Sequence, residues 1–163
     1  MTADLTVRPA TAMDGPALAM LDLATAEPGT YVLPPLPGEP FFGADTVPQD
    51  VLVAEVGRRI VGYLKIRPPT SLESNAHVQQ VQGLAVYPAL RRSGVARALL
   101  AEGLAEAARR GARKLSLRVL SSNPGAIALY RAAGFRVEGV LREEFATDDG
   151  GYADDVLMAQ RVS

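Results

Sequence analysis

Apolar residues recur at strand-like and helix-like spacings, and they predict a chain of alternating strands and helices. Residues Leu5–Arg8 alternate in polarity and predict a first strand. Leucines spaced for one helical face follow the cap candidates Thr11 and Asp14 and predict a helix over Pro16–Ala26. The segment Glu27–Asp50 holds half of the twelve prolines, which excludes a long helix or a central strand there. We therefore expect this proline-rich loop to be mainly irregular.

The rest of the chain again alternates between strand-rich and helix-rich segments. Strands are predicted over 51–56, 59–66, 78–86, 115–120, 135–145 and 152–162, and helices over 97–110 and 124–133. Gly57-Arg58 and Asp148–Gly151 are turn signals that predict hairpins. A change in the phase of the apolar residues near Gly83 predicts a β-bulge. This order of elements implies an α/β fold with a mixed sheet and helices on both of its faces.

Composition narrows the range of functions. The chain has 163 residues, enough for a single domain over 1–163 with a sizeable core, and its net charge of -1 gives no reason to expect a nucleic-acid partner. With no cysteine and one histidine, no thiol nucleophile and no metal site are predicted. No apolar run approaches the roughly 20 residues of a membrane span. Met1–Thr11 lacks the apolar core of a signal peptide, so we expect a cytoplasmic protein without membrane association.

A short basic turn between the strand at 78–86 and the helix at 97–110 carries the first chemical signal. Its residues are Arg91, Arg92, Ser93, Gly94, Val95 and Ala96. At a helix N-terminus such a turn directs backbone N–H groups outward, which suits a phosphate or pyrophosphate. Gly94 has no Cβ, so the backbone can approach the anion closely, and Arg91, Arg92 or Arg97 can add charge-assisted contacts. Taken alone, such a turn is more often a structural loop.

Two linked segments carry a family resemblance. The first is Val81–Pro88 followed by Arg91-x-x-Gly94-x-Ala96, and the second is Asn123–Phe135. They resemble the acetyl-CoA motif of the GCN5-related N-acetyltransferases and that family's Asn-x-x-Ala-x-x-Leu-Tyr-x-x-x-Gly-Phe segment. The second motif is the more specific, and the order of elements extends the resemblance over essentially the whole chain. It implies a mixed, mostly antiparallel central sheet of about seven strands with helices on both faces.

The resemblance also implies how acetyl-CoA is held. The backbone of Leu84, Ala85 and Val86 should pair with the pantetheine amides in the manner of an added strand. An N–H near Val86 should hold the thioester carbonyl and stabilise the oxyanion formed on attack. The backbone N–H groups from Arg92 to Arg97 should donate hydrogen bonds to the pyrophosphate. Asn123 should contact the pantetheine or a site water, although a plain helix N-cap would explain it as well.

Tyr130 is the candidate general acid. Attack by an amine on the thioester expels a thiolate, and a phenol with a pKa near 10 can protonate a thiolate whose thiol has a pKa near 8.5. The resemblance implies this role for Tyr130. The residue type and position alone would favour a core tyrosine on the apolar face of its helix.

The sequence is least informative about the general base. An alkyl amine with a pKa near 10 is almost fully protonated at pH 7, so something must accept a proton. Glu73 and His77 are the candidate bases, and Asp154 and Asp155 are further carboxylates that a water could reach. Ribosomal-protein acetyltransferases of the resembled family use a glutamate on the strand before the second motif. Arg118 occupies the matching position, cannot serve as a base, and weakens the case for a ribosomal-protein substrate.

The resulting hypothesis is an acyltransferase that moves an acetyl group from acetyl-CoA to a primary amine of a small molecule. The amine would attack directly in a ternary complex, and the lack of cysteine agrees with a mechanism without an acyl-enzyme. We expect the proline-rich loop and Thr70–Ala76 to frame the acceptor entrance. Tyr31, Phe41 and Phe42 would either line that pocket or hold the loop against the body of the protein.

Three other functions remain open from the sequence. One is a protein or peptide acetyltransferase acting on an N-terminus or a lysine. Another is a non-catalytic sensor that binds acyl-CoA. The third is a nucleotide-binding module, which the absence of a Gly-x-Gly-x-x-Gly or Gly-Lys-(Ser/Thr) loop disfavours. The sequence fixes neither the amine nor the oligomeric state, and a homodimer is left open.

Overall fold

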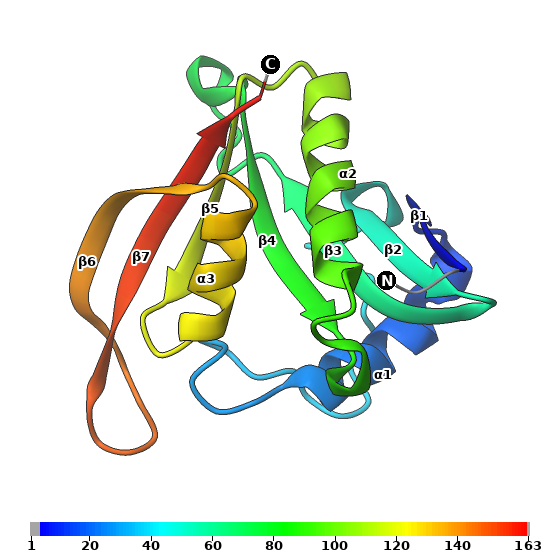
Figure 1. Ribbon diagram of the computed structural model, residues 1–163, viewed down its shortest axis with the longest axis horizontal. Helices are drawn as coiled ribbons and strands as arrows, with labels where there is room; N and C mark the ends of the chain where they lie inside the picture. The colour runs from blue at the N-terminus through cyan, green and yellow to red at the C-terminus, as the bar shows by residue number, and fades with distance from the viewer. Residues whose placement is uncertain (1–3, 163) are drawn as a thin grey trace.

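Seven strands and three α-helices follow one another in the predicted order (Figure 1). The structure is a computed structural model that describes residues 4–162. The strands are β1 (Leu5–Pro9), β2 (Val51–Val56), β3 (Arg59–Arg67), β4 (Val78–Val86), β5 (Lys114–Leu120), β6 (Arg136–Ala146) and β7 (Tyr152–Arg161). The helices are α1 (Gly15–Thr25), α2 (Val95–Arg109) and α3 (Pro124–Ala132). No signal peptide is predicted over Met1–Thr11, and residues 1–3 of that segment lie outside the described residues.

All seven strands form one sheet in the order β1-β2-β3-β4-β5-β7-β6. Every neighbouring pair is antiparallel except β4 and β5, which run parallel. The β4–β5 register covers only Val78↔Lys114 to Val81↔Leu117. Beyond these pairs the two strands diverge toward their C-terminal ends, as Figure 1 shows. The sheet is therefore continuous across all seven strands only at the N-terminal ends of β4 and β5.

Helix α1 covers one face of the sheet, and α2 and α3 cover the other (Figure 1). Strand β2 is buried on both faces: Val51 and Val53 pack with α1, whereas Leu52 and Ala54 pack with the core under α2. This division follows from the alternation of side chains along a strand. The face under α2 and α3 carries the larger core, and the face under α1 carries a smaller one.

The predicted bulge in β4 is confirmed. Lys65 of β3 pairs with Gly83, and the next residue, Ile66, pairs with Val81, so Gln82 has no partner in the β3–β4 register. The extra residue turns the following part of β4 relative to β3, at the point where β4 has already left β5. The bulge in β4 thus lies next to the point where β4 and β5 separate, near the middle of the sheet; we call this separation the splay.

The predicted elements are confirmed with shifts of one or two residues at their ends. The proline-rich loop is irregular except for a short 3₁₀ turn at Pro48–Asp50, and a similar turn at Glu73–Asn75 interrupts the loop before β4. Two further 3₁₀ turns lie at Ala12–Asp14 and Pro88–Leu90. Within residues 4–162, no helix is long and apolar enough to cross a membrane.

Candidate active site

The edge of β4 that faces the splay offers free backbone groups. The N–H of Tyr87 donates to the Val61 carbonyl of β3 at 2.9 Å. In an antiparallel pair such bonds involve every second residue, so Ala85 also bonds to β3. The N–H and C=O groups of Leu84 and Val86 consequently point to the open edge, where no β5 residue pairs with them. Of the three predicted pantetheine contacts, Leu84 and Val86 are oriented for the role, and Ala85 is not.

The turn before α2 has the features of an anion site. Gly94 is the N-cap of α2 with a φ of 91°, and Arg92 also has a positive φ, of 63°. Within residues 4–162, no protein acceptor receives the backbone N–H groups of residues 92–97. The Ser93 hydroxyl donates to the Leu90 carbonyl and tightens the turn. These N–H groups lie at the N-terminal, positive end of a helix of 15 residues, which attracts an anion.

The arginines of this turn differ in their contacts. Arg91 pairs with Glu27 at the start of the proline-rich loop, with 2.7 Å between Nη1 and Oε1. In the described part of the chain, no acidic side chain lies within ion-pair distance of Arg92 or Arg97. Arg92 and Arg97 are therefore the turn cations available to an anionic ligand, and Arg91 would first have to leave Glu27.

Tyr130 lies on α3 with its ring buried in the core under α2 and α3. The residue is 8% exposed, and its ring meets Phe135 edge-on with 5.9 Å between centroids. None of the fully buried side-chain polar atoms described lacks a partner, and the Tyr130 hydroxyl makes no hydrogen bond, so this oxygen must reach the protein surface. Burial raises the pKa of Tyr130 to about 12. The phenol therefore keeps its proton at neutral pH, as a general acid must.

Asn123 is the N-cap of α3. Its side-chain oxygen accepts a hydrogen bond from the Ala126 N–H at 3.2 Å, so the structural interpretation of this residue is correct. The side-chain NH₂ group has no partner within the described residues and can still donate to a ligand. Capping and ligand contact thus use different atoms of one amide.

The structure separates the two candidate bases from the rest of the site. Glu73 and His77 precede β4, whereas Val86 ends it and the anion turn follows it. At about 3.3 Å per residue, the length of β4 puts roughly 26 Å between its two ends. Both side chains are exposed, and the six-residue step along β4 from Val78 to Leu84 alone spans about 20 Å. This separation along β4 argues against Glu73 or His77 as the base, and the loop Thr70–Ala76 lies at the same end of the strand.

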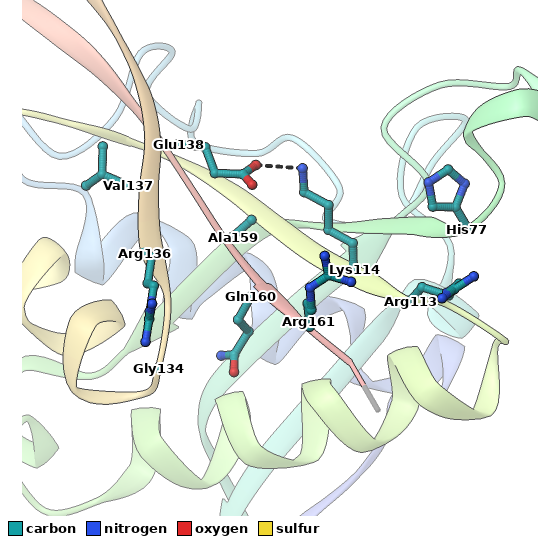
Figure 2. A pocket seen from close by; sticks show the side chains of 10 residues that line it. All are labelled: His77, Arg113, Lys114, Gly134, Arg136, Val137, Glu138, Ala159, Gln160 and Arg161. Atoms are coloured by element: carbon teal, nitrogen blue, oxygen red, sulfur yellow. Dashed lines mark ion pairs between the residues drawn. The ribbon is translucent and has the colours of Figure 1, made fainter.

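His77 instead borders a wide basic cleft at that far end of the sheet (Figure 2). The cleft has a volume of about 1080 Å³ and is bordered by residues from the N-terminal ends of β4, β5 and β6 and the C-terminal end of β7. Lys114 Nζ pairs with Glu138 Oε1 at 2.6 Å, and Figure 2 shows this ion pair. Neither the open edge at Val86 nor Tyr130 contributes to this cleft.

A smaller pocket lies on the α1 face, next to the bulge. It has a volume of about 280 Å³. The side chains that can form polar contacts in it are Asp22 of α1, Tyr63 and Lys65 of β3, Gln82 of β4, and Glu39 and Thr46 of the proline-rich loop. Apolar side chains of the loop complete it, and Phe41 both lines the pocket and packs edge-on against Tyr63, with centroids 5.0 Å apart.

The loop aromatics were predicted either to line a pocket or to hold the loop in place, and Phe41 does both. Phe42 packs into the smaller core and meets Gly15 of α1, so it only holds the loop. Tyr31 belongs neither to the pocket lining nor to either core.

Arg118 and Asp155 form an ion pair across β5 and β7. The guanidinium of Arg118 donates through both Nε and Nη2 to one oxygen of Asp155, whose side chain is only 3% exposed. This pairing keeps Asp155 from acting as an accessible base. It also explains how an arginine is accommodated at the position where the resemblance places a glutamate, because the buried carboxylate neutralises it.

Comparisons with known proteins show the family of the chain. The model of the Acetyltransferase (GNAT) family matches residues 18–135. The [ribosomal protein bS18]-alanine N-acetyltransferase of Escherichia coli K12 is 40% identical over 80 residues, which are 49% of this chain and 53% of that protein. The same enzyme from Salmonella typhimurium LT2 is 38% identical over 80 residues. The chain thus matches these curated relatives over about half of their length.

Solved structures with the same fold cover nearly the whole chain. The protein smu.2055 of Streptococcus mutans is 28% identical with a TM-score of 0.85, and the match covers 97% of this chain and 99% of that one. The ribosomal-protein-alanine N-acetyltransferase of Brucella melitensis is 26% identical with a TM-score of 0.76, covering 96% and 99%. The predicted fold and the resemblance noted in the sequence are confirmed. The chain therefore belongs to the Acetyltransferase (GNAT) family.

Proposed function

We propose that this protein transfers the acetyl group of acetyl-CoA to the primary amine of a small molecule. The observation that carries the proposal is the free backbone edge at Leu84 and Val86, which leads to the unpartnered N–H groups before α2. A strand-like pantetheine arm fits the first feature, and a pyrophosphate fits the second. One ligand that carries both groups is a coenzyme A thioester.

The same arrangement supports catalysis by position and by charge. The N–H of Val86 points to the edge where a thioester carbonyl would lie, and it would stabilise the oxyanion formed on attack. Tyr130 would give its proton to the sulfur as the C–S bond breaks, and its raised pKa ensures that it still carries that proton at neutral pH. Holding the amine and the thioester together in one complex can contribute about 7–11 kcal/mol.

The pocket on the α1 face supports a small acceptor. A thioester hydrogen-bonded in the plane of the sheet exposes its carbonyl carbon above and below that plane. Side chains of the larger core fill the face under α2 and α3, whereas the α1 face has the pocket beside Gln82. Its volume of about 280 Å³ is near the lower limit for small-molecule sites. The proline-rich loop closes it on one side, which favours a compact amine over a chain end.

A panel of amines with acetyl-CoA and purified protein tests the proposal. Initial rates measured while both substrates are varied should give intersecting lines, as direct attack in a ternary complex requires. Parallel lines would indicate an acyl-enzyme instead. If the protein binds acetyl-CoA but acetylates no amine in a wide panel, the sensor function replaces the enzyme.

A second candidate is acetylation of a protein N-terminus, which the bS18-alanine N-acetyltransferase relatives favour. Arg118, held by Asp155, replaces the glutamate expected of such enzymes and argues against it. Peptides that begin with alanine belong in the same panel. A kcat/KM for such a peptide far above that of every small amine would establish this second function.

A further inference from the structure

Asp22 and Tyr63 form a pair that neither the anion turn nor the general acid explains. The Tyr63 hydroxyl donates to Asp22 Oδ1 at 2.6 Å, and the two residues come from α1 and β3, 41 positions apart. Tyr63 is 7% exposed, and burial raises its pKa well above the ordinary value, so it remains a donor. Within residues 4–162 no other side chain donates to the Asp22 carboxylate. One carboxylate oxygen is therefore held, and the other is free to face the pocket.

This pair lies directly beneath the bulge of β4. A Cβ added to Gly83 would lie 3.1 Å from Cε2 of Tyr63 and 3.3 Å from its hydroxyl. Gln82, the unpaired residue of the bulge, lines the same pocket as Asp22 and Tyr63. Two contacts thus connect the Asp22 carboxylate to the backbone just before Leu84, whose N–H and C=O point to the open edge.

We propose that Asp22 is the general base that accepts a proton from the acceptor amine, and that Tyr63 positions it. This inference rests on the proposed acetyl transfer and adds the missing proton acceptor to it. The base and the acid then act from opposite faces of the sheet. Asp22 reaches the amine from the α1 face, and Tyr130 reaches the sulfur from the face under α3.

The protons balance in this scheme. The bound ammonium loses one proton to Asp22, and the resulting amine attacks the thioester carbon as the C–N bond forms. The nitrogen of the tetrahedral adduct loses a second proton as the C–S bond breaks. Tyr130 gives its proton to the sulfur and is reprotonated from solvent, while the second proton of nitrogen and the proton held by Asp22 pass to solvent. The products are the amide, coenzyme A as a free thiol, and one proton.

The other charges around Asp22 do not replace it. Lys65 and Glu39 face the same pocket, and Lys65 donates to Thr46 Oγ1 at 2.6 Å. Burial first, and then the charge of Arg67, lower the pKa of Lys65. Glu39 is exposed and makes no hydrogen bond with a described side chain. Tyr63 touches Asp22 directly but is a donor, so Asp22 is the pocket carboxylate that is both held in place and able to accept.

The test is the pH profile of Asp22→Asn with n-butylamine as the acceptor. If Asp22 removes the proton, wild-type kcat/KM stays level from about pH 6 to pH 9, where an alkyl amine is still mostly protonated. Asp22→Asn can use only amine that is already neutral, so its kcat/KM should rise about tenfold per pH unit. At pH 7 the loss should be about 10²- to 10⁴-fold.

Two comparisons separate this role from a structural one. With L-leucinamide, whose α-amine has a pKa near 8, the loss at pH 7 should be smaller than with n-butylamine. Asp45→Asn removes an exposed negative charge that acts on Lys65 without lining the pocket, and it should keep the level profile of the wild type. Thermal unfolding identifies variants that fail to fold, and Asp22→Ser then takes the place of Asp22→Asn.

The outcomes are distinct. A level profile in Asp22→Asn, or an equal loss at every pH and with both amines, would overturn the assignment of Asp22 while acetyl transfer stands. A wild type that acetylates neither n-butylamine, L-leucinamide nor any other amine of the panel would overturn the proposed function, and this inference with it.

Discussion

Tyr130 shows how one buried residue can serve two needs. Its ring fills the core beside Phe135, and the same burial disfavours the phenolate, which raises the pKa to about 12. A tyrosine in water would already lose some of its proton at moderately alkaline pH. Tyr130 should therefore remain a proton donor across the whole pH range in which acceptor amines become neutral.

Replacement of Tyr130 by Phe should lower kcat by about 10²- to 10⁴-fold, because the thiolate must then leave without a proton donor. The Kd for acetyl-CoA should change little, because the turn before α2 and the edge of β4 are untouched. Steady-state kinetics and calorimetry measure the two quantities. Turnover equal to that of the wild type would remove Tyr130 from the mechanism.

The raised pKa can be observed without any substrate. The ultraviolet difference between wild type and Tyr130→Phe, followed during an alkaline titration, should show ionisation near pH 12, above the ordinary value of 10.0. The folded state holds this proton more tightly than the unfolded chain. The free energy of unfolding should therefore fall as the pH rises from about 10 to about 12. A midpoint near 10 would mean that the hydroxyl is well solvated.

At the scale of elements, the N-terminus of α2 depends on a conformation that favours glycine. Gly94 has a φ of 91°, and a Cβ there would meet no atom within 4 Å. Another residue at position 94 would thus be strained by the positive φ of the backbone, and its Cβ would not clash with any neighbouring atom. Gly111, beyond the other end of the same helix, has a φ of 78° and equally open surroundings. The two glycines form a matched pair, one at the proposed pyrophosphate site and one far from it.

Gly94→Ala and Gly111→Ala should each destabilise the fold by about 1–2 kcal/mol, the cost of a left-handed residue with a Cβ. Only Gly94→Ala should also weaken acetyl-CoA binding, because the added Cβ and a shifted turn disturb the N–H groups that face the anion. Chemical denaturation and calorimetry on both variants separate the effects. An equal loss of affinity in both would argue against a pyrophosphate at Gly94.

The sequence predicted the elements because their signals are local. The prolines of the loop, the turn at Gly57 and the phase change near Gly83 each act within a few residues, and all three predictions hold. The sequence did not show in the same way at which end of β4 each flanking residue would lie. His77 seemed close to the site in sequence, yet β4 carries it to the opposite end of the sheet.

The pairing of Asp22 with Tyr63 could not be predicted either. It joins two residues 41 positions apart, and only the packing of α1 on the sheet brings them together. A carboxylate on an amphipathic helix is usually a solvated residue, so its type and spacing gave no signal. What the sequence did provide was the loop that closes the pocket, through Phe41 and its neighbouring prolines.

At the scale of the whole molecule, the sheet consists of two parts joined by a short parallel contact. Strands β1 to β4 form one part, and β5 to β7 form the other, with the four pairs from Val78 to Val81 between them. A ligand that bonds to the free edge of β4 would add a strand in the gap. Binding should thus stabilise the two parts together.

Acetyl-CoA at 100 times its Kd should add about 2.7 kcal/mol to the free energy of unfolding. For a chain of this size, each kcal/mol raises Tm by roughly 2–4 °C. Differential scanning fluorimetry with increasing acetyl-CoA measures the shift, and Gly94→Ala should need more ligand for the same effect. ATP is the control, and a shift with ATP in the absence of any shift with acetyl-CoA would support a nucleotide-binding module.

The two faces of the sheet have a consequence for how substrates enter the site and how products leave it. The turn before α2 lies beyond the C-terminal end of β4, whereas the α1-face pocket lies beside the bulge at Gln82, on the face of the sheet opposite α2. On the proposed assignment, donor and acceptor therefore have separate routes. The acetylated amine can leave through its own opening while coenzyme A is still held, and neither product obstructs the other. Substitutions in the proline-rich loop could then change which amine is accepted without altering the residues that bind acetyl-CoA.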